Sequence, residues 1–333
     1  MADVAFTAAE LDRAVGIVGR HVPPTPAYAW PLLAGEVGAD VWVKHENHTP
    51  TGAFKVRGGL VYVERLRRER PGVAGIVSAT RGNHGQSLGF AGRLYGLPVA
   101  IVVPHGNSAE KNASMVALGV ELIEHGEDFQ AAREHARVVA DERGFEMVES
   151  FHPDLVLGVA TYAHELFTAV PAIDTVYVPV GMGSGICGLI GVRDLLGLST
   201  EIVGVVAEGA PATLRSFEAG HVVSTEAAAT FVDGVACRVP DADAVAAIVA
   251  GAARIVAVPD DATREAMRVL HRCTHSAVEP SGAISLAAAI SERDRIDGTR
   301  IAVILSGGNA DTDLLVDVLS GRVWSSRSLR RLR

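Results

Sequence analysis

The stretch Val176-Tyr177-Val178-Pro179-Val180-Gly181-Met182-Gly183-Ser184-Gly185 joins an apolar run to a turn rich in glycine. The apolar run fits a strand buried in a parallel sheet, and the glycines fit the tight turn that leads from such a strand into a helix. A turn of this composition can present backbone N–H groups as a nest for a phosphate, although close backbone packing would also require glycine. The stretch therefore predicts one strand, turn and helix unit of an α/β fold.

The same alternation of apolar runs and helical patterns recurs along the chain. Buried strands are predicted at residues 41–43, 76–77, 99–103, 120–123, 202–206 and 301–305. Between them, apolar residues recur every three or four positions, as at Val56, Leu60 and Val63, and another such pattern ends at Gly96, a natural helix stop. This alternation predicts βαβ units and a largely parallel sheet.

Length and composition agree with this fold class. A chain of 333 residues exceeds the usual size of one compact domain, so we expect two lobes that share a cleft. Apolar residues make up 48% of the chain and aromatic residues 5%, which indicates an aliphatic core suited to helices packed on a parallel sheet. Such sheets bind ligands where strands end and helices begin, and we expect the functional residues there.

Charge and cysteine content exclude several classes of partner. The net charge of −9 argues against sequence-independent binding to nucleic acid or an anionic membrane, because both need a clustered positive surface. Cys187, Cys237 and Cys273 are widely spaced, which fits a reducing compartment rather than a disulfide framework. Residues 1–16 lack an export signal, and the small-apolar run 244–253 is too short to cross a bilayer. We expect a cytoplasmic protein without a membrane partner.

Three further segments carry polar residues at the ends of strands. The segment 44–59 places Lys55 at the start of a helix, where the helix dipole and nearby Arg57 would lower the lysine pKa and leave an amine able to form a Schiff base. The turn 78–86 has free N–H groups that could hold a carboxylate, and the segment 305–309 also follows a strand. Taken singly, Lys55 also fits a surface lysine, and the turn fits an ordinary capped helix.

Together and in this order, the four segments resemble those of the fold type II pyridoxal-phosphate enzymes, and within them the threonine/serine dehydratase and serine racemase group. The resemblance runs from about Val22 to Leu319. Residues 51–58 match the lysine motif of this family, except that Ala53 stands where a serine is usual. The resemblance implies an α/β fold with two open, mainly parallel sheet lobes, pyridoxal 5′-phosphate between them, and a homodimer.

We expect the chain to divide between these two lobes. Residues 1–74 and 148–320 would form the large, cofactor-binding lobe, and residues 75–147 the small, mobile lobe. The lobes should close on the substrate. Residues 321–333, with five arginines and few apolar side chains, would form a poorly anchored C-terminal tail.

The resemblance also implies roles for individual residues. Lys55 would carry the cofactor as a Schiff base and then remove the α-proton of the substrate as general base, with Phe54 beside it among the cofactor-binding residues. Asn83 would hydrogen-bond the cofactor's 3′-oxygen, and Ser306 would face its pyridine nitrogen. Glu279 would assist proton movement, although a carboxylate favoured by a helix N-terminus explains it equally well.

Two backbone loops would hold the charged ends of the ligands. The phosphate would lie against the N–H groups of Gly181, Met182, Gly183, Ser184 and Gly185, which needs no net positive charge. The substrate carboxylate would lie in the loop Thr80, Arg81, Gly82, Asn83 and His84. Because Ser306 is neutral and cannot enforce protonation of the ring, a partly stabilised carbanion should expel a β-hydroxyl. The implied activity is that of an ammonia-lyase, which converts a 3-hydroxy amino acid such as threonine or serine into a 2-oxo acid and ammonia.

Two positions depart from the patterns of relatives. Arg81 stands where serine racemases carry a serine, and a guanidinium cannot serve as the second acid/base of racemisation. It could pair with a second substrate carboxylate, as in 3-hydroxyaspartate, or point outward. Some relatives bind a cation through an acid at the position of Glu208, but the second acid would fall at Leu214, so we expect no required metal.

Other functions remain open from the sequence. The substrate could be 3-hydroxyaspartate or a bulkier 3-hydroxy amino acid such as phenylserine, and the same fold also supports β-replacement. A nicotinamide-dependent dehydrogenase is a remote alternative, because Ile186 occupies the third glycine position of the G-x-G-x-x-G fingerprint even though Glu201 lies near the expected distance. A sensor that binds the cofactor without turnover is a third class.

Overall fold

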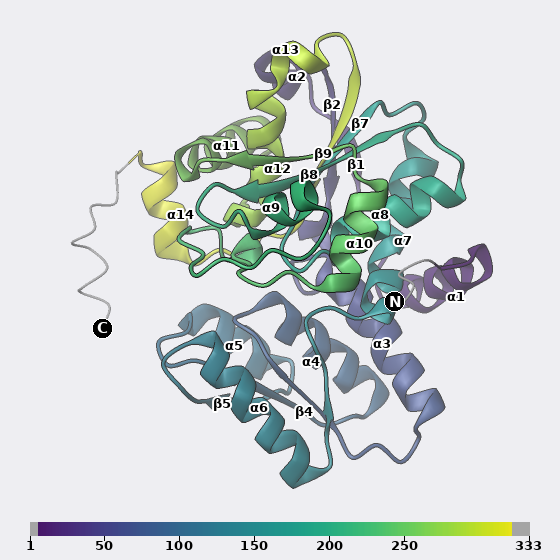
Figure 1. Cartoon of the computed structure of the whole chain (residues 1–333), viewed down its shortest axis with the longest axis vertical. Helices are drawn as coiled ribbons and strands as arrows, with labels where there is room; N and C mark the ends of the chain where they lie inside the picture. Colours follow the sequence, from purple (N-terminus) through teal and green to yellow (C-terminus); the bar gives the residue numbers. More distant parts are fainter. Residues whose placement is uncertain (1–5, 322–333) are drawn as a thin grey trace.

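The computed structural model describes residues 6–321, which form two lobes, each built on its own sheet (Figure 1). The first sheet has six strands in the order β1-β2-β10-β7-β8-β9. Its strands are β1 (Ala27–Ala29), β2 (Asp40–His45), β7 (Thr175–Pro179), β8 (Glu201–Ala207), β9 (Arg254–Val258) and β10 (Arg300–Leu305). Its strands are parallel except for β1, which pairs antiparallel with β2 at one edge.

The second sheet has four parallel strands in the order β5-β4-β3-β6. They are β3 (Ile76–Ala79), β4 (Val99–Val103), β5 (Glu121–Glu124) and β6 (Glu146–Met147). Each apolar run singled out in the sequence lies in or overlaps one of the strands of the two sheets. The predicted α/β class with mainly parallel sheets is confirmed.

Helices cover both sheets. In chain order, the first six helices are α1 (Ala8–Gly19), α2 (Pro31–Val37), α3 (Lys55–Glu69), α4 (Asn83–Tyr95), α5 (Ala109–Ala117) and α6 (Phe129–Arg143). The later helices are α7 (Pro153–Ala169), α8 (Ser184–Leu195), α9 (Ala212–Ala219), α10 (Ala242–Gly251), α11 (Asp260–Thr274), α12 (Pro280–Ser291), α13 (Arg293–Ile296) and α14 (Thr312–Leu319). Two short 3₁₀ helices, η1 (Glu46–His48) and η2 (Asp233–Val235), lie in loops.

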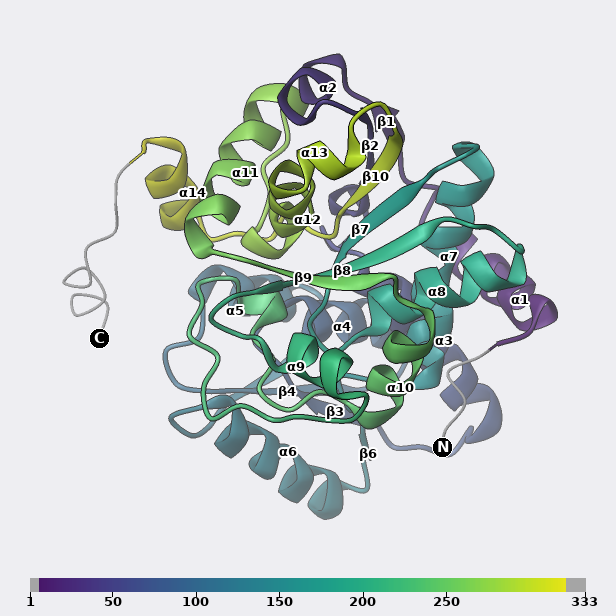
Figure 2. The same cartoon turned by 45° about the horizontal axis from the view of Figure 1, so that its top comes forward.

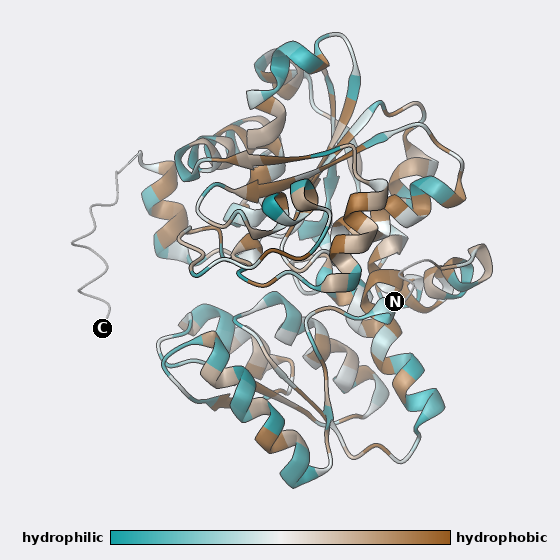
Figure 3. Cartoon of the chain, in the orientation of Figure 1, coloured by the Kyte–Doolittle hydropathy of each residue, from teal (hydrophilic) through white to brown (hydrophobic). Residues whose placement is uncertain are grey.

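The apolar pattern explains how helices and sheets pack. All five residues of β4 are buried, as expected for a strand covered on both faces. Helix α6 turns Ala132, Ala136 and Val139 toward this sheet, while its other side is hydrophilic (Figure 3). Gly96 ends α4 in the left-handed conformation with φ 62°, which confirms the predicted helix stop.

Helix α3 connects the two lobes and packs against α4 and α7 (Figures 1 and 2). Its glycines permit unusually close approach: a Cβ on Gly59 would collide with Ser87 of α4, and a Cβ on Gly158 of α7 would collide with the carbonyl of Arg57. Ser87 Oγ in turn donates a hydrogen bond to the carbonyl oxygen of Lys55 over 2.6 Å. This packing fixes the first turn of α3 between the two sheets.

The two sheets are formed by different parts of the chain, while the expected lobe bounds stay a prediction. Strands β3 to β6 all lie within residues 75–147, whereas the strands of the first sheet lie outside this range. Mobility of the small lobe stays a prediction. The expected C-terminal tail lies, from residue 322 onward, outside the described residues. Within residues 6–321, no helix is both long and apolar enough to cross a membrane.

Candidate active site

Lys55 is the first residue of α3, and its side chain points toward the start of α8. Its Nζ lies 3.3 Å from Ser184 Oγ and 5.2 Å from the centre of the Phe54 ring. Phe54 precedes the helix without a side-chain cap. The structure therefore brings the predicted Schiff-base lysine to the glycine-rich turn, although 129 positions separate the two residues in the sequence.

The predicted depression of the lysine pKa is confirmed, but its cause differs from the expected one. Burial lowers the pKa of Lys55 to about 8, because a partly buried ammonium loses hydration. Arg57 does not supply the effect, since its guanidinium points away into a cluster of acids that compensates its charge. The sequence reasoning identified a nearby cation but could not foresee its partners.

The turn between β7 and α8 has the geometry of an anion nest. Gly183 adopts φ +103°, and a Cβ there would lie 2.8 Å from the Cβ of Ala244, so this position requires glycine. A Cβ on Gly181 would collide with the carbonyl of Gly234. No side chain caps α8. The first hydrogen bond of the helix runs from the N–H of Cys187 to the carbonyl of Gly183, so the N–H groups before Cys187 are free for a ligand.

The residues of this nest lie together as expected. Gly183, Ser184 and Gly185 are buried, and Gly181 and Met182 are half-buried. Met182 contacts Cys237, with 3.7 Å between the two sulfur atoms. A short uncapped turn of this kind binds a phosphate through backbone N–H groups and the helix dipole, without a cationic side chain.

The segment after β10 lies directly beside the lysine segment. The N–H of Phe54 donates to the carbonyl of Ser306 over 3.0 Å, and the N–H of Gly308 donates to the carbonyl of Gly52 over 2.9 Å. Ser306 is buried, and its hydroxyl donates to the carbonyl of Ser281 over 3.2 Å. The lysine and the predicted partner of the pyridine nitrogen are thus held by one backbone ladder.

Glu279 and Asn83 form a polar bridge between the lobes. Asn83 Nδ2 donates to the two carboxylate oxygens of Glu279 over 2.9 and 3.0 Å, and Asn83 Oδ1 accepts from Asn309 Nδ2 over 2.8 Å. Ser281 Oγ also donates to Glu279 over 2.8 Å. Burial nevertheless raises the pKa of the Glu279 carboxyl above its ordinary value, although the hydrogen bonds from Asn83 and Ser281 oppose that rise.

The loop predicted to bind the substrate carboxylate lies between β3 and α4. Thr80, Gly82 and His84 are buried, whereas the side chain of Arg81 is exposed. The backbone carbonyl of Arg81 accepts a hydrogen bond from Asn107 Nδ2 over 3.2 Å. Because no side chain caps α4, its first N–H groups are available to an anion.

His84 is a neutral group within this loop. Burial lowers its pKa to about 3, and the charge of Lys55 acts in the same direction. Its Nε2 is buried and has no hydrogen-bond partner among the described residues. An unpaired buried nitrogen normally has a cost, which a bound ligand with a donor group could remove.

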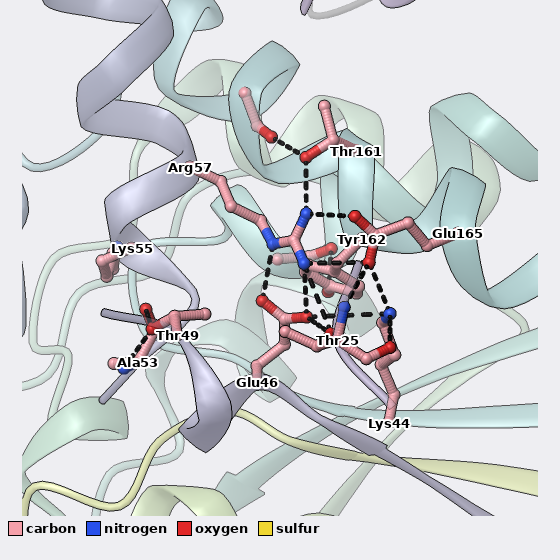
Figure 4. Close-up of polar contacts among 12 residues, drawn as sticks. Thr25, Lys44, Glu46, Thr49, Ala53, Lys55, Arg57, Thr161, Tyr162 and Glu165 are labelled. Atoms are coloured by element: carbon pink, nitrogen blue, oxygen red, sulfur yellow. Dashed lines mark hydrogen bonds and ion pairs between the residues drawn. The ribbon is translucent and has the colours of Figure 1, made fainter. Parts of the chain in front are cut away.

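Behind Lys55 lies an ion cluster formed by Lys44, Glu46, Arg57 and Glu165, of which the first three are fully buried and Glu165 is 18% exposed (Figure 4). Arg57 donates to Glu46 over 2.7 Å and to Glu165 over 2.6 Å, and Lys44 donates to Glu165 over 2.6 Å. Burial alone would lower the pKa of Arg57, but the two facing carboxylates hold it above its usual range. Two cations and two anions leave the cluster without net charge.

This cluster is connected to the nest through Tyr162, which neighbours Thr161 on α7. Thr161 accepts a hydrogen bond from Arg57 over 3.1 Å. The hydroxyl of Tyr162 donates to the carbonyl of Gly185 over 3.0 Å, and its ring meets Phe54 edge to face, with 6.1 Å between the centroids. Sequence reasoning gave no role to Tyr162, which belongs to no recognisable motif, or to Glu46, although Glu46 lies within the segment 44–59.

The residues present fit pyridoxal 5′-phosphate. They combine the Lys55 amine, whose pKa is lowered, with a glycine nest that a Cβ would fill. They also include the buried neutral hydroxyl of Ser306, which a backbone ladder holds beside the lysine segment. Lys55 would hold the cofactor covalently, the turn 181–185 its phosphate, Asn83 its 3′-oxygen and Ser306 its ring nitrogen. Among the described residues there is no group of three or more His, Cys, Asp or Glu side chains placed to hold a metal ion.

Comparison with known proteins defines the class to which this site belongs. The family described as "Pyridoxal-phosphate dependent enzyme" matches residues 18–307, which span both lobes. The chain therefore belongs to this family of pyridoxal-phosphate-dependent enzymes. The family resemblance inferred from the four segments is confirmed.

Individual relatives cover nearly the whole chain. The L-threo-3-hydroxyaspartate ammonia-lyase of Saccharomyces cerevisiae is 28% identical over 306 residues, or 92% of this chain and 94% of that protein. The L-threonine ammonia-lyase of Thermotoga maritima is 28% identical over 313 residues, or 93% of this chain and 78% of that protein. Among solved structures, maize serine racemase matches with a TM-score of 0.88 and 26% identity, covering 98% of this chain and 99% of that one. The fold is thus that of the fold type II enzymes.

Proposed function

We propose that this protein is an ammonia-lyase that removes water from a 3-hydroxy amino acid and releases a 2-oxo acid and ammonia. The observation that carries the proposal is the Lys55 amine, whose pKa is lowered to about 8 and whose Nζ lies 3.3 Å from Ser184 Oγ at the nest. A buried serine, Ser306, lies beside this segment. Two relatives named as ammonia-lyases, one for L-threo-3-hydroxyaspartate and one for L-threonine, support the same reaction type.

Bound pyridoxal phosphate supplies the covalent link to the substrate amine and an electron sink for the α-carbon. Lys55 Nζ removes the α-proton, and its lowered pKa leaves an appreciable fraction of the amine neutral near physiological pH. Ser306 is neutral and holds no charge that would enforce protonation of the ring nitrogen. This arrangement favours departure of the β-hydroxyl over transamination.

The substrate carboxylate is proposed to bind at the start of α4. The free N–H groups of this turn and the helix dipole attract an anion there. Burial lowers the pKa of His84 to about 3, so its ring adds no charge there, and burial raises the pKa of Glu279, whose carboxyl oxygens accept hydrogen bonds from Asn83. Glu279 is therefore proposed to assist proton movement at the opposite side of the site from the nest.

A panel of substrates tests the proposal. Purified protein is incubated with L-threonine, L-serine, L-threo-3-hydroxyaspartate and phenylserine, and ammonia and 2-oxo acid are measured. We expect equal amounts of both products from at least one substrate, without any added sulfur nucleophile. Release of neither product from any of the four, in protein that binds the cofactor, would refute the dehydratase function and leave β-replacement or ligand sensing.

We also infer that the protein acts as a homodimer in the cytoplasm. The inference rests on the family resemblance, on the acidic net charge of −9 and on the three cysteines, which are buried and free rather than paired. Light scattering of the purified protein should give about twice the mass of 34.8 kDa. A monomeric mass across the micromolar range would contradict the dimer.

A further inference from the structure

Lys111 is a cation beside the proposed site, and the proposed reaction gives it no role. The chain contains three lysines: Lys44 belongs to the buried ion cluster, Lys55 is the proposed base, and Lys111 lies in the first turn of α5. Its side chain is only 18% exposed, which is low for a lysine outside the core. Such burial of an ammonium calls for a compensating group nearby.

The stem of Lys111 covers the loop proposed to hold the substrate carboxylate. Its Cδ lies 3.0 Å from the position that a Cβ on Gly82 would occupy. Gly82 directly precedes the uncapped first turn of α4. The ammonium therefore extends past this loop toward η2 of the large lobe.

The partner of the ammonium on the large lobe is Asp233 of η2. Lys111 Nζ and Asp233 Oδ2 are 3.5 Å apart, which is longer than a direct hydrogen bond. Asp233 itself is 57% exposed, so much of its hydration is retained. An ammonium has three N–H donors. Within residues 6–321, the polar contact of the Lys111 ammonium is this loose ion pair. The pair can exchange for a better anion at low cost.

The short helix η2 borders both ends of the proposed site. The carbonyl of Gly234 closes over Gly181 of the nest, and a Cβ on Gly234 would lie 2.6 Å from Ser281 Oγ, which is hydrogen-bonded to Glu279. Burial raises the pKa of Glu279, and the charge of Lys111 opposes that rise. Lys111 therefore lies between the substrate loop, η2 and Glu279, where the far end of a substrate would be.

We propose that Lys111 binds a second carboxylate on the substrate, so that the protein acts on 3-hydroxy amino acids with two carboxyl groups, of which 3-hydroxyaspartate is the simplest. This proposal rests on the dehydratase function proposed above. Arg81, the other cation of this loop, has an exposed side chain, whereas Lys111 is held over the loop by its packing on Gly82. The first carboxylate would bind at the start of α4 and the second would replace Asp233 beside Lys111.

This exchange makes opposite predictions for the two members of the ion pair. Removing the positive charge in Lys111→Met should weaken binding of a dicarboxylic substrate. Removing the negative charge in Asp233→Asn should strengthen it, because Asp233 competes for the ammonium and repels the incoming carboxylate. If the pair merely held the lobes together, both substitutions would impair every substrate in the same direction.

The experiment measures kcat/KM of the cofactor-loaded enzyme for L-threo-3-hydroxyaspartate and L-threonine. We expect the ratio of the two values to fall at least tenfold in Lys111→Met and to rise in Asp233→Asn. Arg93→Met, which changes an exposed cation at the other end of α4, is the matched control and should leave the ratio unchanged. A fall of less than tenfold in Lys111→Met, or a fall in Asp233→Asn, would overturn the proposal.

Binding of malonate, a dicarboxylate without the reacting groups, gives a second readout through the absorbance of the bound cofactor. Its dissociation constant should rise at least tenfold in Lys111→Met and not in Arg93→Met. This readout also decides the case in which threonine turns over too slowly to measure. Failure of the two proposals can be told apart: wild-type enzyme that deaminates no hydroxy amino acid refutes the dehydratase function, whereas an active enzyme with unchanged selectivity and malonate affinity refutes the role of Lys111.

Discussion

Lys55 Nζ lies 3.3 Å from Ser184 Oγ, so the first residue of α3 faces the first residue of α8. Both helices begin without a side-chain cap, and both begin at the edge where parallel strands of the first sheet end. The amine that would bind the cofactor and the nest that would bind its phosphate are thus positioned by helix packing rather than by mobile loops. Rigid placement of this kind is what a covalently held cofactor requires.

Replacing the proposed base should remove both attachment and turnover. In Lys55→Ala, we expect the visible absorbance of the bound cofactor to disappear on dialysis and kcat to fall by roughly 10²–10⁴-fold or more, because a positioned base contributes about that much. Absorbance after dialysis, ammonia release and a circular dichroism spectrum would be measured together. A variant that stays coloured and active would exclude Lys55 as the catalytic lysine.

Tyr162→Phe should loosen the nest without removing any group that contacts the cofactor. The change deletes the hydrogen bond from the Tyr162 hydroxyl to the carbonyl of Gly185, worth about 1 kcal/mol, or roughly a fivefold change in a binding constant. Titration of the apoprotein with pyridoxal phosphate should therefore show severalfold weaker binding. Tyr95→Phe is a suitable control, because Tyr95 lies at the far end of α4. Equal affinities of Tyr162→Phe and wild type would mean that this contact does not shape the nest.

Ser306→Asp should change the chemistry by placing a carboxylate at the ring nitrogen. The side chain at this position is buried, so a negative charge there would favour a protonated ring and a stronger electron sink. We expect a shifted cofactor spectrum and a larger share of transamination relative to elimination. Ser306→Ala, which removes the hydroxyl without adding charge, separates the effect of charge from that of the lost hydrogen bond to Ser281. Identical spectra and products in Ser306→Asp and wild type would exclude contact with the nitrogen.

Glu279 should make the stability of the protein depend on pH in a defined direction. Because burial raises the pKa of its carboxyl in the folded state above the ordinary value of 4.5, the folded protein favours the protonated form. The associated stability is fully present below about pH 4.5 and is lost as the pH rises through the folded pKa. Glu279→Gln mimics the protonated acid and should lack this dependence.

The measurement compares the free energy of urea-induced unfolding of wild type and Glu279→Gln at several pH values. The value for wild type minus that for the variant should fall as the pH rises above about 4.5 and level off once the folded carboxyl is ionised. The difference cancels contributions of the other acids. A difference that grows with pH would mean that the hydrogen bonds from Asn83 and Ser281 outweigh burial.

The buried ion cluster should depend strongly on Glu165. Glu165→Ala leaves Arg57 and Lys44 with one carboxylate between them in a buried environment, and breaking such a cluster typically costs roughly 3–5 kcal/mol of unfolding free energy. Glu69→Ala removes the partner of Arg65 in an exposed ion pair and should cost far less. Urea denaturation of both variants gives the comparison. Similar losses in the two would show that the cluster is not a significant source of stability.

Much of the fold followed from local pattern. The longer buried strands β4, β7, β8 and β10 each contain an apolar run, and the helix stop at Gly96 uses the conformational freedom of glycine, so both are visible without tertiary contacts. Strands β1 and β6 have three and two residues, too short to give a pattern. Strand β9 was also missed, because it follows the small-apolar helix α10 after a short connection, and the two form one long apolar stretch.

The sequence by itself determined the α/β class and the family and singled out Lys55, Ser184 and Ser306 as site candidates, because these depend on motifs of neighbouring residues. Tertiary structure alone decided what surrounds them. The charge of Arg57 is compensated by Glu165, which lies 108 positions away, so the lysine pKa is lowered by burial and not by that cation. Lys111 likewise acquires its proposed role through its packing on Gly82 and its distance to Asp233. Electrostatic effects depend on separation in space and on loss of water, and neither quantity is encoded in local sequence spacing.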